Sequence, residues 1–314
     1  MNKRSLGTNV YSMVSQWNLR RLIRIFVIFG IIFSLSGSYL WYSRLYLNDE
    51  RKFWMAIENS MSTPSVTRTL TSGGTGNQVV QKNQIHFSPN MVTNSLVTFN
   101  QRNATEDTLV TTEGISFPDA LYSRYTEFST TSSKPDGTKP TLDPVLGEWE
   151  ANIPEEELLE QSKFNYVSEL VTLVVFGNFD AEFRNDVIKS LQDSGAYDIN
   201  FAGVSDDVID GSDVRLFPVS VRLKPYVEQL QRAFVHAGYG EFPPLDPANY
   251  TEDSRVPVTI AVDKQSGAIA GVSFGGRQES YSGYGIRKTI EKPETKYESG
   301  ELERIVQEEL QGVL

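Results

Sequence analysis

The stretch VPVTIAVDKQSGAIAGVSFGG, residues 256–276, predicts a β-hairpin. Ile260 and Val262 alternate with Thr259 and Ala261, and the segment 264–267 then interrupts the pattern before a second apolar run begins. Alternation on both sides of a glycine-containing turn is typical of two antiparallel strands. The charged residues of this hairpin belong to its turn, so we expect it to form a wall of a sheet and to face water at its tip.

A series of similar short strands is predicted earlier in the chain. The segments are rich in Thr, Val, Phe and Tyr, and turn-forming residues separate them. A regular spacing of short strands without intervening helices predicts an antiparallel meander. Polar and apolar residues alternate along these strands, which predicts that one face of the sheet covers an apolar layer and the other meets water. The predicted strands are Val66–Thr71, Gln78–Phe87, Val92–Gln101, Thr108–Ile115 and Leu121–Phe128.

Apolar residues at helical spacing predict helices before and after this meander. These helices are Glu50–Met61, one that begins near Pro154, Phe183–Leu191, Tyr226–Ala237 and Glu301–Leu314, the last capped by Ser299. Residues 171–176 fit either a helix or a buried strand, and Ser129–Pro144 has the composition of a loop. Further strands are expected at Tyr197–Phe201, Arg215–Leu223, Gln278–Tyr284 and Ile286–Ile290. The fold class is therefore α+β.

The charge distribution argues against nucleic-acid binding. The chain of 314 residues has a net charge of −11, and it contains no cysteine and 2 histidines. The first 24 residues carry five basic side chains and no acidic ones, which leaves 24 basic and 40 acidic residues, a net charge of −16, in the remainder. Phosphate recognition needs basic surfaces. The lack of cysteine also excludes disulfides, thiolate nucleophiles and cysteine-based zinc sites.

An uncharged segment, Ile25–Tyr42, predicts a single membrane-spanning helix. Arg20, Arg21 and Arg24 precede it, and the positive-inside rule then places the N-terminus in the cytoplasm and the main domain outside. A cleaved signal peptide with a site near residues 36–38 and a buried core helix are the alternatives.

The expected organisation has four parts: a basic cytoplasmic tail at 1–24, a transmembrane helix at 25–46, an extracytoplasmic domain at 47–298 and an amphipathic helix at 299–314. We expect this last helix to pack on its own domain.

Several of these segments together resemble the LolA/LppX-type superfamily of extracytoplasmic lipoprotein carriers and lipid-binding lipoproteins. The resemblance covers roughly Phe53 to Pro293, and its motifs are short and structural. They are the helix and Thr-rich meander, the run DVRLFPVSVRLKPYVEQL, the hairpin with its turn Asp263–Gly267, and the pair Tyr284-Gly285 ahead of Pro293.

This resemblance implies an open half-barrel, a strongly curved antiparallel sheet with helices in its concave side. It also implies that lipids, acyl chains or envelope proteins are the partners. The chain departs from the family because a membrane helix takes the place of a lipid-modified cysteine, which favours local binding or sensing over shuttling. The apolar residues expected on the inner face are core residues or ligand contacts: Leu70, Ile115, Val219, Val221, Ile260, Val262 and Phe274.

Four patterns that suggest chemistry each have a plainer interpretation. The glycines at 73–76 lack the Lys-Ser/Thr that a phosphate-binding loop needs. The acidic turn with Asp206, Asp207, Asp210 and Asp213 lacks the spacing of a calcium loop. His86 or His236 with a serine would suggest a hydrolase, but no G-x-S-x-G motif occurs. The acids at 155–157 suit the start of a helix.

The sequence thus predicts a membrane-anchored, extracytoplasmic binding protein that is not an enzyme and needs no cofactor. Its expected ligand is a lipid or another apolar molecule held in the concave face of the sheet. The alternative is a structural or regulatory subunit of a cell-envelope complex that has no ligand cavity.

Overall fold

The computed structural model describes residues 34, 48–74, 76–88, 91–102, 107–152 and 171–311. The chain divides into two compact units, residues 1–52 and 53–314, and the second contains the sheet. The expected membrane helix lies outside the described residues apart from Ser34, as do the basic tail and the helix expected from Pro154. In the part that is described, every helix is too short or too polar to cross a membrane.

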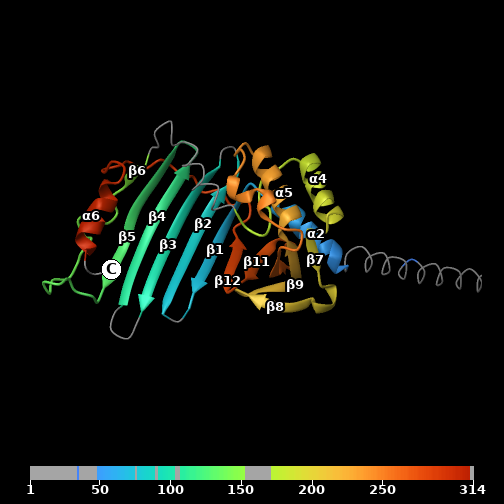
Figure 1. The fold of residues 1–314 in the computed structure, drawn as a ribbon, viewed down its shortest axis with the longest axis horizontal. Helices are drawn as coiled ribbons and strands as arrows, with labels where there is room; N and C mark the ends of the chain where they lie inside the picture. Colours follow the sequence, from blue (N-terminus) through green and yellow to red (C-terminus); the bar gives the residue numbers. More distant parts are fainter. Residues whose placement is uncertain are drawn as a thin grey trace, which may run out of the picture. The chain divides into compact units, whose positions relative to one another are not determined.

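Residues 53–314 form a curved, unclosed antiparallel sheet, which has 12 strands in the described part (Figure 1). The strand order is β6-β5-β4-β3-β2-β1-β12-β11-β10-β9-β7, with β8 paired to β9, so the two ends do not meet. All five predicted strands of the meander are confirmed, as is the hairpin at 256–276. The strands are β1 (Ser65–Gly73), β2 (Asn77–His86), β3 (Val92–Arg102), β4 (Asp107–Phe117), β5 (Ala120–Thr130), β6 (Glu150–Asn152), β7 (Tyr197–Ile199), β8 (Ser205–Ile209), β9 (Ser212–Arg222), β10 (Arg255–Asp263), β11 (Ile269–Phe274) and β12 (Arg277–Ser282).

The four described α-helices gather at the two ends of the sheet (Figure 1). They are α2 (Asp49–Ser60), α4 (Ala181–Asp193), α5 (Leu223–His236) and α6 (Glu301–Leu310), with short 3₁₀ turns at Phe201–Gly203, Pro243–Leu245 and Pro247–Asn249. Side chains from α2, α4 and α5 share one apolar cluster with strands β9 to β12. The middle of the sheet, formed by β1 to β5, lies between these helices and α6.

Aromatic and aliphatic side chains fill the main core. Phe53 on α2 and Phe217 on β9 are fully buried and meet edge to face with ring centroids 5.5 Å apart. Tyr226 and Leu230 on α5 are 1% exposed. Burying a side chain of this size contributes roughly 1.5–3 kcal/mol, so this cluster fixes the helices on their half of the sheet.

The last helix, α6, packs on its own domain as predicted. Leu302, Val306 and Leu310 form a separate buried cluster with Leu142 and Val145.

The predicted cap of this helix at Ser299 is wrong. Gly300 occupies the cap position, and the buried carboxylate of Glu150 accepts the backbone N–H of Gly300 at 2.6 Å and of Leu302 at 2.9 Å. The Ser299 hydroxyl instead donates to Asn152. A carboxylate from β6 therefore satisfies amides that a local serine was expected to satisfy.

Residues 171–176 form neither the helix nor the strand that their apolar run suggested. Side-chain hydroxyls donate hydrogen bonds to the carbonyls of this segment, in place of the backbone hydrogen bonds of a helix or a sheet. The hydroxyl of Tyr226 donates to the carbonyl of Thr172 at 2.8 Å, that of Tyr197 to Leu173 at 3.0 Å, and that of Ser60 to Val175 at 2.8 Å. Because the buried carbonyls are paired in this way, the segment stays irregular inside the core.

Two other expectations need correction. The acidic residues 206–213 form the hairpin β8–β9, in which Asp210 and Gly211 both have positive φ, as a tight two-residue turn requires. Residues 286–290 are not a strand. The turn of the hairpin at 263–267 is as expected, with Gly267 at φ +67°.

Candidate functional site

Most of the predicted ligand contacts belong to the main core. Val219, Val221, Ile260 and Val262 are at most 4% exposed, and they share the apolar cluster of α2 and α5. Phe274 is half-buried and packs against the same cluster. The structure thus places these five side chains in a layer already filled by the protein itself.

The remaining two predicted contacts lie on opposite faces of the sheet. Leu70 pairs with Gln81, and successive pairs continue through Val97 to Thr112. Side chains alternate between faces along a strand, so Ile115, three residues beyond Thr112, points to the other side. It packs with Ala120 and Tyr122 in a separate cluster. The expectation that Ile115 faces inward with Leu70 is wrong.

The strand register places an apolar row across the helix-side face of β1 to β5. Val79 on β2 is opposite Phe99 on β3, and Phe99 is opposite Val110 on β4. Val97 lies beside them on the same face. All four side chains are half-buried, in contrast to the core. At the far end of the row, Phe128 on β5 packs against the α6 cluster.

A polar row lies on the same face, separated from this apolar row by the mixed row of Leu70, Gln81, Val97 and Thr112. Arg68 on β1 is opposite Tyr281 on β12 and Asn83 on β2, and Ser95 on β3 follows. The Ser95 hydroxyl donates to Asn83 Oδ1 at 2.9 Å. Gly114 on β4 comes next in the row. This face of the sheet therefore has an apolar side and a polar side.

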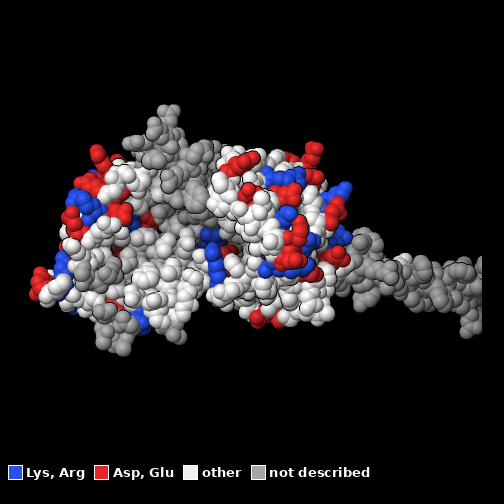
Figure 2. Space-filling model, viewed as in Figure 1, with Lys and Arg blue, Asp and Glu red and all other residues white. Residues whose placement is uncertain are grey.

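Figure 2 shows that this face of the domain is hollowed between α6 and the α4–α5 region, and that most of the visible floor is uncharged, with basic and acidic side chains near its middle. Charged side chains gather on either side, over α6 and over the α4–α5 region (Figure 2). A mostly uncharged floor between two rims that carry acidic and basic side chains suits a ligand that is apolar along most of its length.

A second cavity of about 370 Å³ lies at the C-terminal end of α5. Its polar lining residues are Ser88, Asn178, Asp180 and His236, and its aromatic rings are those of Phe87, Phe176, Phe179, Phe234 and Tyr239. Phe176 also stacks on Tyr281 with a centroid distance of 4.6 Å, which brings the cavity close to the polar row.

The histidine of this cavity is held in a structural role. His236 Nε2 is 3.3 Å from an Asp180 carboxylate oxygen, and its ring stacks on Phe183 with centroids 3.8 Å apart. Among the described residues no hydrogen bond joins His236 to Ser88. The Asp180 carboxylate also caps α4 through the Phe183 amide at 2.9 Å, and these bonds lower the pKa of Asp180.

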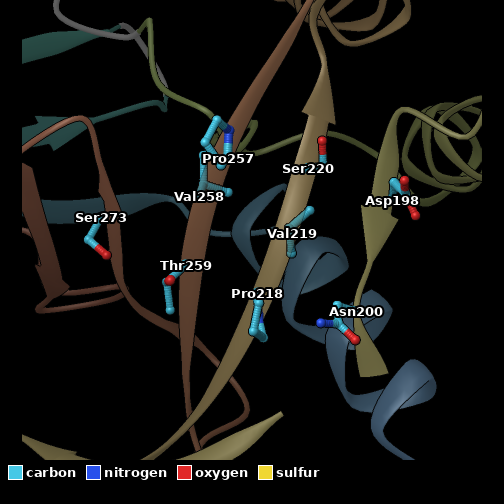
Figure 3. Close-up of a pocket in the computed structure, with 9 residues that line it drawn as sticks. All are labelled: Asp198, Asn200, Pro218, Val219, Ser220, Pro257, Val258, Thr259 and Ser273. Carbon is cyan, nitrogen blue, oxygen red and sulfur yellow. The ribbon is translucent and has the colours of Figure 1, made fainter. Parts of the chain in front are cut away.

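A third depression, of about 410 Å³, lies on the opposite face of the sheet (Figure 3). Figure 3 shows Pro218, Ser220 and Thr259 on this face, with α2 behind the strands. Two prolines, two valines and several small polar side chains line this open hollow.

The other residues considered for chemistry are engaged elsewhere. Asp206 forms ion pairs with Arg215 at 3.0 Å and with Lys264 at 3.0 Å, which lower its pKa. Within the described ranges no three acidic or histidine side chains gather as a metal site would require. Burial, and secondarily Arg287, lowers the pKa of His86.

Arg68, Asn83 and the apolar row Val79–Val97–Phe99–Val110 were absent from the predicted site. Their strand alternation was visible in the sequence, but which strands pair and in what register was not.

Comparisons with known proteins give one structural likeness. No family model matches the chain, and no curated protein matches it. A crystal structure of LprF from Mycobacterium bovis aligns with a TM-score of 0.40 and 12% sequence identity, over 78% of this chain and 98% of that chain. The function proposed below is therefore inferred from the residues of this chain.

Proposed function

We propose that this chain is a membrane-anchored, extracytoplasmic binding protein that holds a lipid or another apolar ligand against the helix-side face of β1 to β5. The observation that carries the proposal is the half-buried row Val79, Phe99 and Val110 on a face that is hollowed. Each methylene buried on such a surface contributes about 0.8 kcal/mol, so a long alkyl chain gains enough to offset part of the loss of freedom on binding.

The anchoring half of the proposal depends on the sequence. Residues 25–42 are uncharged and follow three arginines, which supports a single-pass helix with the sheet domain outside the cytoplasm. We propose binding rather than catalysis, and the contacts of His236 support this: its partner Asp180 caps α4, and its ring stacks on Phe183.

A structural or regulatory subunit of an envelope complex is the second candidate. The observation in its favour is the filled core over β9 to β12, where five of the predicted ligand contacts are packed by the protein itself. In this case the face of β1 to β5 would be covered by a protein partner.

Native mass spectrometry of the full-length chain in detergent tests the proposal. We expect a mass adduct of a co-purified lipid, or a new adduct when a long-chain lipid is added to delipidated protein. A bare mass under both conditions contradicts ligand binding and leaves the subunit role.

A further inference from the structure

Arg68 is buried on the helix-side face without the partners that a buried guanidinium normally has. It is 3% exposed, and its Nε and Nη1 atoms make no hydrogen bond. Among the described residues, no carboxylate lies within ion-pair distance of it. A buried charge is costly unless it is paired, so an unpaired guanidinium in this position needs an explanation.

Asn83, directly opposite Arg68, is in the same situation. It is fully buried, its Oδ1 accepts the Ser95 hydroxyl, and its Nδ2 has no partner. The unpaired atoms of this adjacent pair are all hydrogen-bond donors. Side chains directly opposite each other in an antiparallel pair lie about 4.5–5.5 Å apart at Cβ, so one group of acceptor oxygens can reach both.

The nearby acidic residue does not neutralise Arg68. The Glu279 carboxylate lies with Oε1 3.0 Å from Arg277 Nε, an ion pair without a hydrogen bond, and it accepts the Tyr281 hydroxyl at Oε2. Among the described residues, this part of the face carries two guanidinium groups, Arg68 and Arg277, and one carboxylate, Glu279, a net charge of +1.

We infer that Arg68 and Asn83 form an anion-binding subsite that receives the phosphate or carboxylate headgroup of the ligand. The inference rests on the proposed function, because the apolar row Val79–Phe99–Val110 lies on the same face as the polar row, with Val97 between them, and would hold the attached chain. An arginine fork and an amide donor suit a charged oxygen group with two or more acceptors. The ligand class is thus an anionic amphiphile.

The test titrates the full-length chain in neutral detergent with three probes: hexadecyl phosphate, hexadecanol and inorganic phosphate. We expect hexadecyl phosphate to bind at least about tenfold more tightly than hexadecanol, since hydrogen bonds to a charged group are worth this much. We expect Arg68→Met to abolish this preference and to leave hexadecanol binding within about twofold. Lys82→Met is the matched control, because Lys82 lies next to Asn83 on the opposite face and is exposed.

Different results contradict the anion subsite and the binding of an apolar ligand. Equal affinities for hexadecyl phosphate and hexadecanol, or an unchanged preference in Arg68→Met, overturn the anion subsite while ligand binding stands. Binding of neither amphiphile overturns the proposed function. Inorganic phosphate that binds as tightly as hexadecyl phosphate overturns the amphiphile as the ligand class.

A thermal melt of the ligand-free protein separates a binding role from a structural one. Removing an unpaired buried charge is expected to raise Tm or leave it unchanged in Arg68→Met, whereas a lower Tm than in Lys82→Met contradicts the inference. If Arg68→Met does not fold, Arg68→Lys decides: a retained preference for hexadecyl phosphate over hexadecanol supports the inference, and its loss opposes it.

Discussion

Glu150 on β6 holds the first turn of α6, because its carboxylate accepts the backbone N–H of Leu302 at 2.9 Å. Glu150 is 3% exposed, so water does not replace this bond when the carboxylate is removed. The relationship joins two segments that lie 152 residues apart in the chain.

Replacing this carboxylate should therefore loosen α6. We expect Glu150→Ala to lower the free energy of unfolding by about 1–3 kcal/mol, as the loss of a helix cap and of buried hydrogen bonds does. Hydrogen exchange at the amides of 301–310 should speed up. Glu303→Ala, an exposed acid in the same first turn, is the control and should stay within about 0.5 kcal/mol of wild type. Equal exchange in both variants would contradict this account.

Tyr226 should stabilise the irregular segment 171–176. Its hydroxyl donates to the Thr172 carbonyl at 2.8 Å inside the core. Tyr226→Phe leaves that buried carbonyl without this donor, so we expect a loss of about 1–3 kcal/mol in the free energy of unfolding, measured by chemical denaturation. A stability equal to that of wild type would show that the carbonyl finds another partner.

His86 should make stability depend on pH. Burial first, and Arg287 second, lowers its pKa below the ordinary value of 6.5. The unfolded state then binds the proton more readily, so the stability that His86 contributes is present above pH 6.5 and is lost as the pH falls. We expect wild type to lose stability relative to His86→Gln between pH 7.5 and 5. Parallel pH profiles for the two proteins would rule this out.

Gly114 offers a way to fill the hollow. Among the described residues, a Cβ at this position would have only the Tyr122 carbonyl oxygen within 4 Å, at 3.8 Å, so there is room for the first atom of a side chain. Gly114→Leu adds bulk on the helix-side face, and we expect it to weaken hexadecanol binding at least about tenfold while Tm is kept or raised. Thr69→Leu on the outer face of β1 is the matched control. Equal losses in both variants would count against a site on the helix-side face.

Alternation and turn residues were sufficient to predict the meander, the hairpin and most helices. The failures came where distant residues decide the local structure. Residues 171–176 are irregular because tyrosine hydroxyls from β7 and α5 pair with their carbonyls. The cap of α6 comes from Glu150, and nothing in the local sequence near Ser299 shows it.

The candidate site was harder to predict than the fold. Whether Ile115 shares a face with Leu70 depends on the register of three strand pairs, which alternation alone does not fix. A buried arginine in a Thr-rich strand resembles a surface residue in the sequence. Arg68 became a candidate only when the structure showed it buried, with its Nε and Nη1 atoms unpaired.

Photocrosslinking tests the central claim most directly, because neighbouring residues of β3 point to opposite faces. The full-length chain would be loaded with a diazirine-bearing hexadecyl phosphate, irradiated, and mapped by mass spectrometry. The account predicts adducts at Val97 and Phe99, on the helix-side face, and none above background at Leu96 and Thr98, on the outer face. Adducts at Leu96 and Thr98, or no adduct that unlabelled lipid competes away, would contradict it.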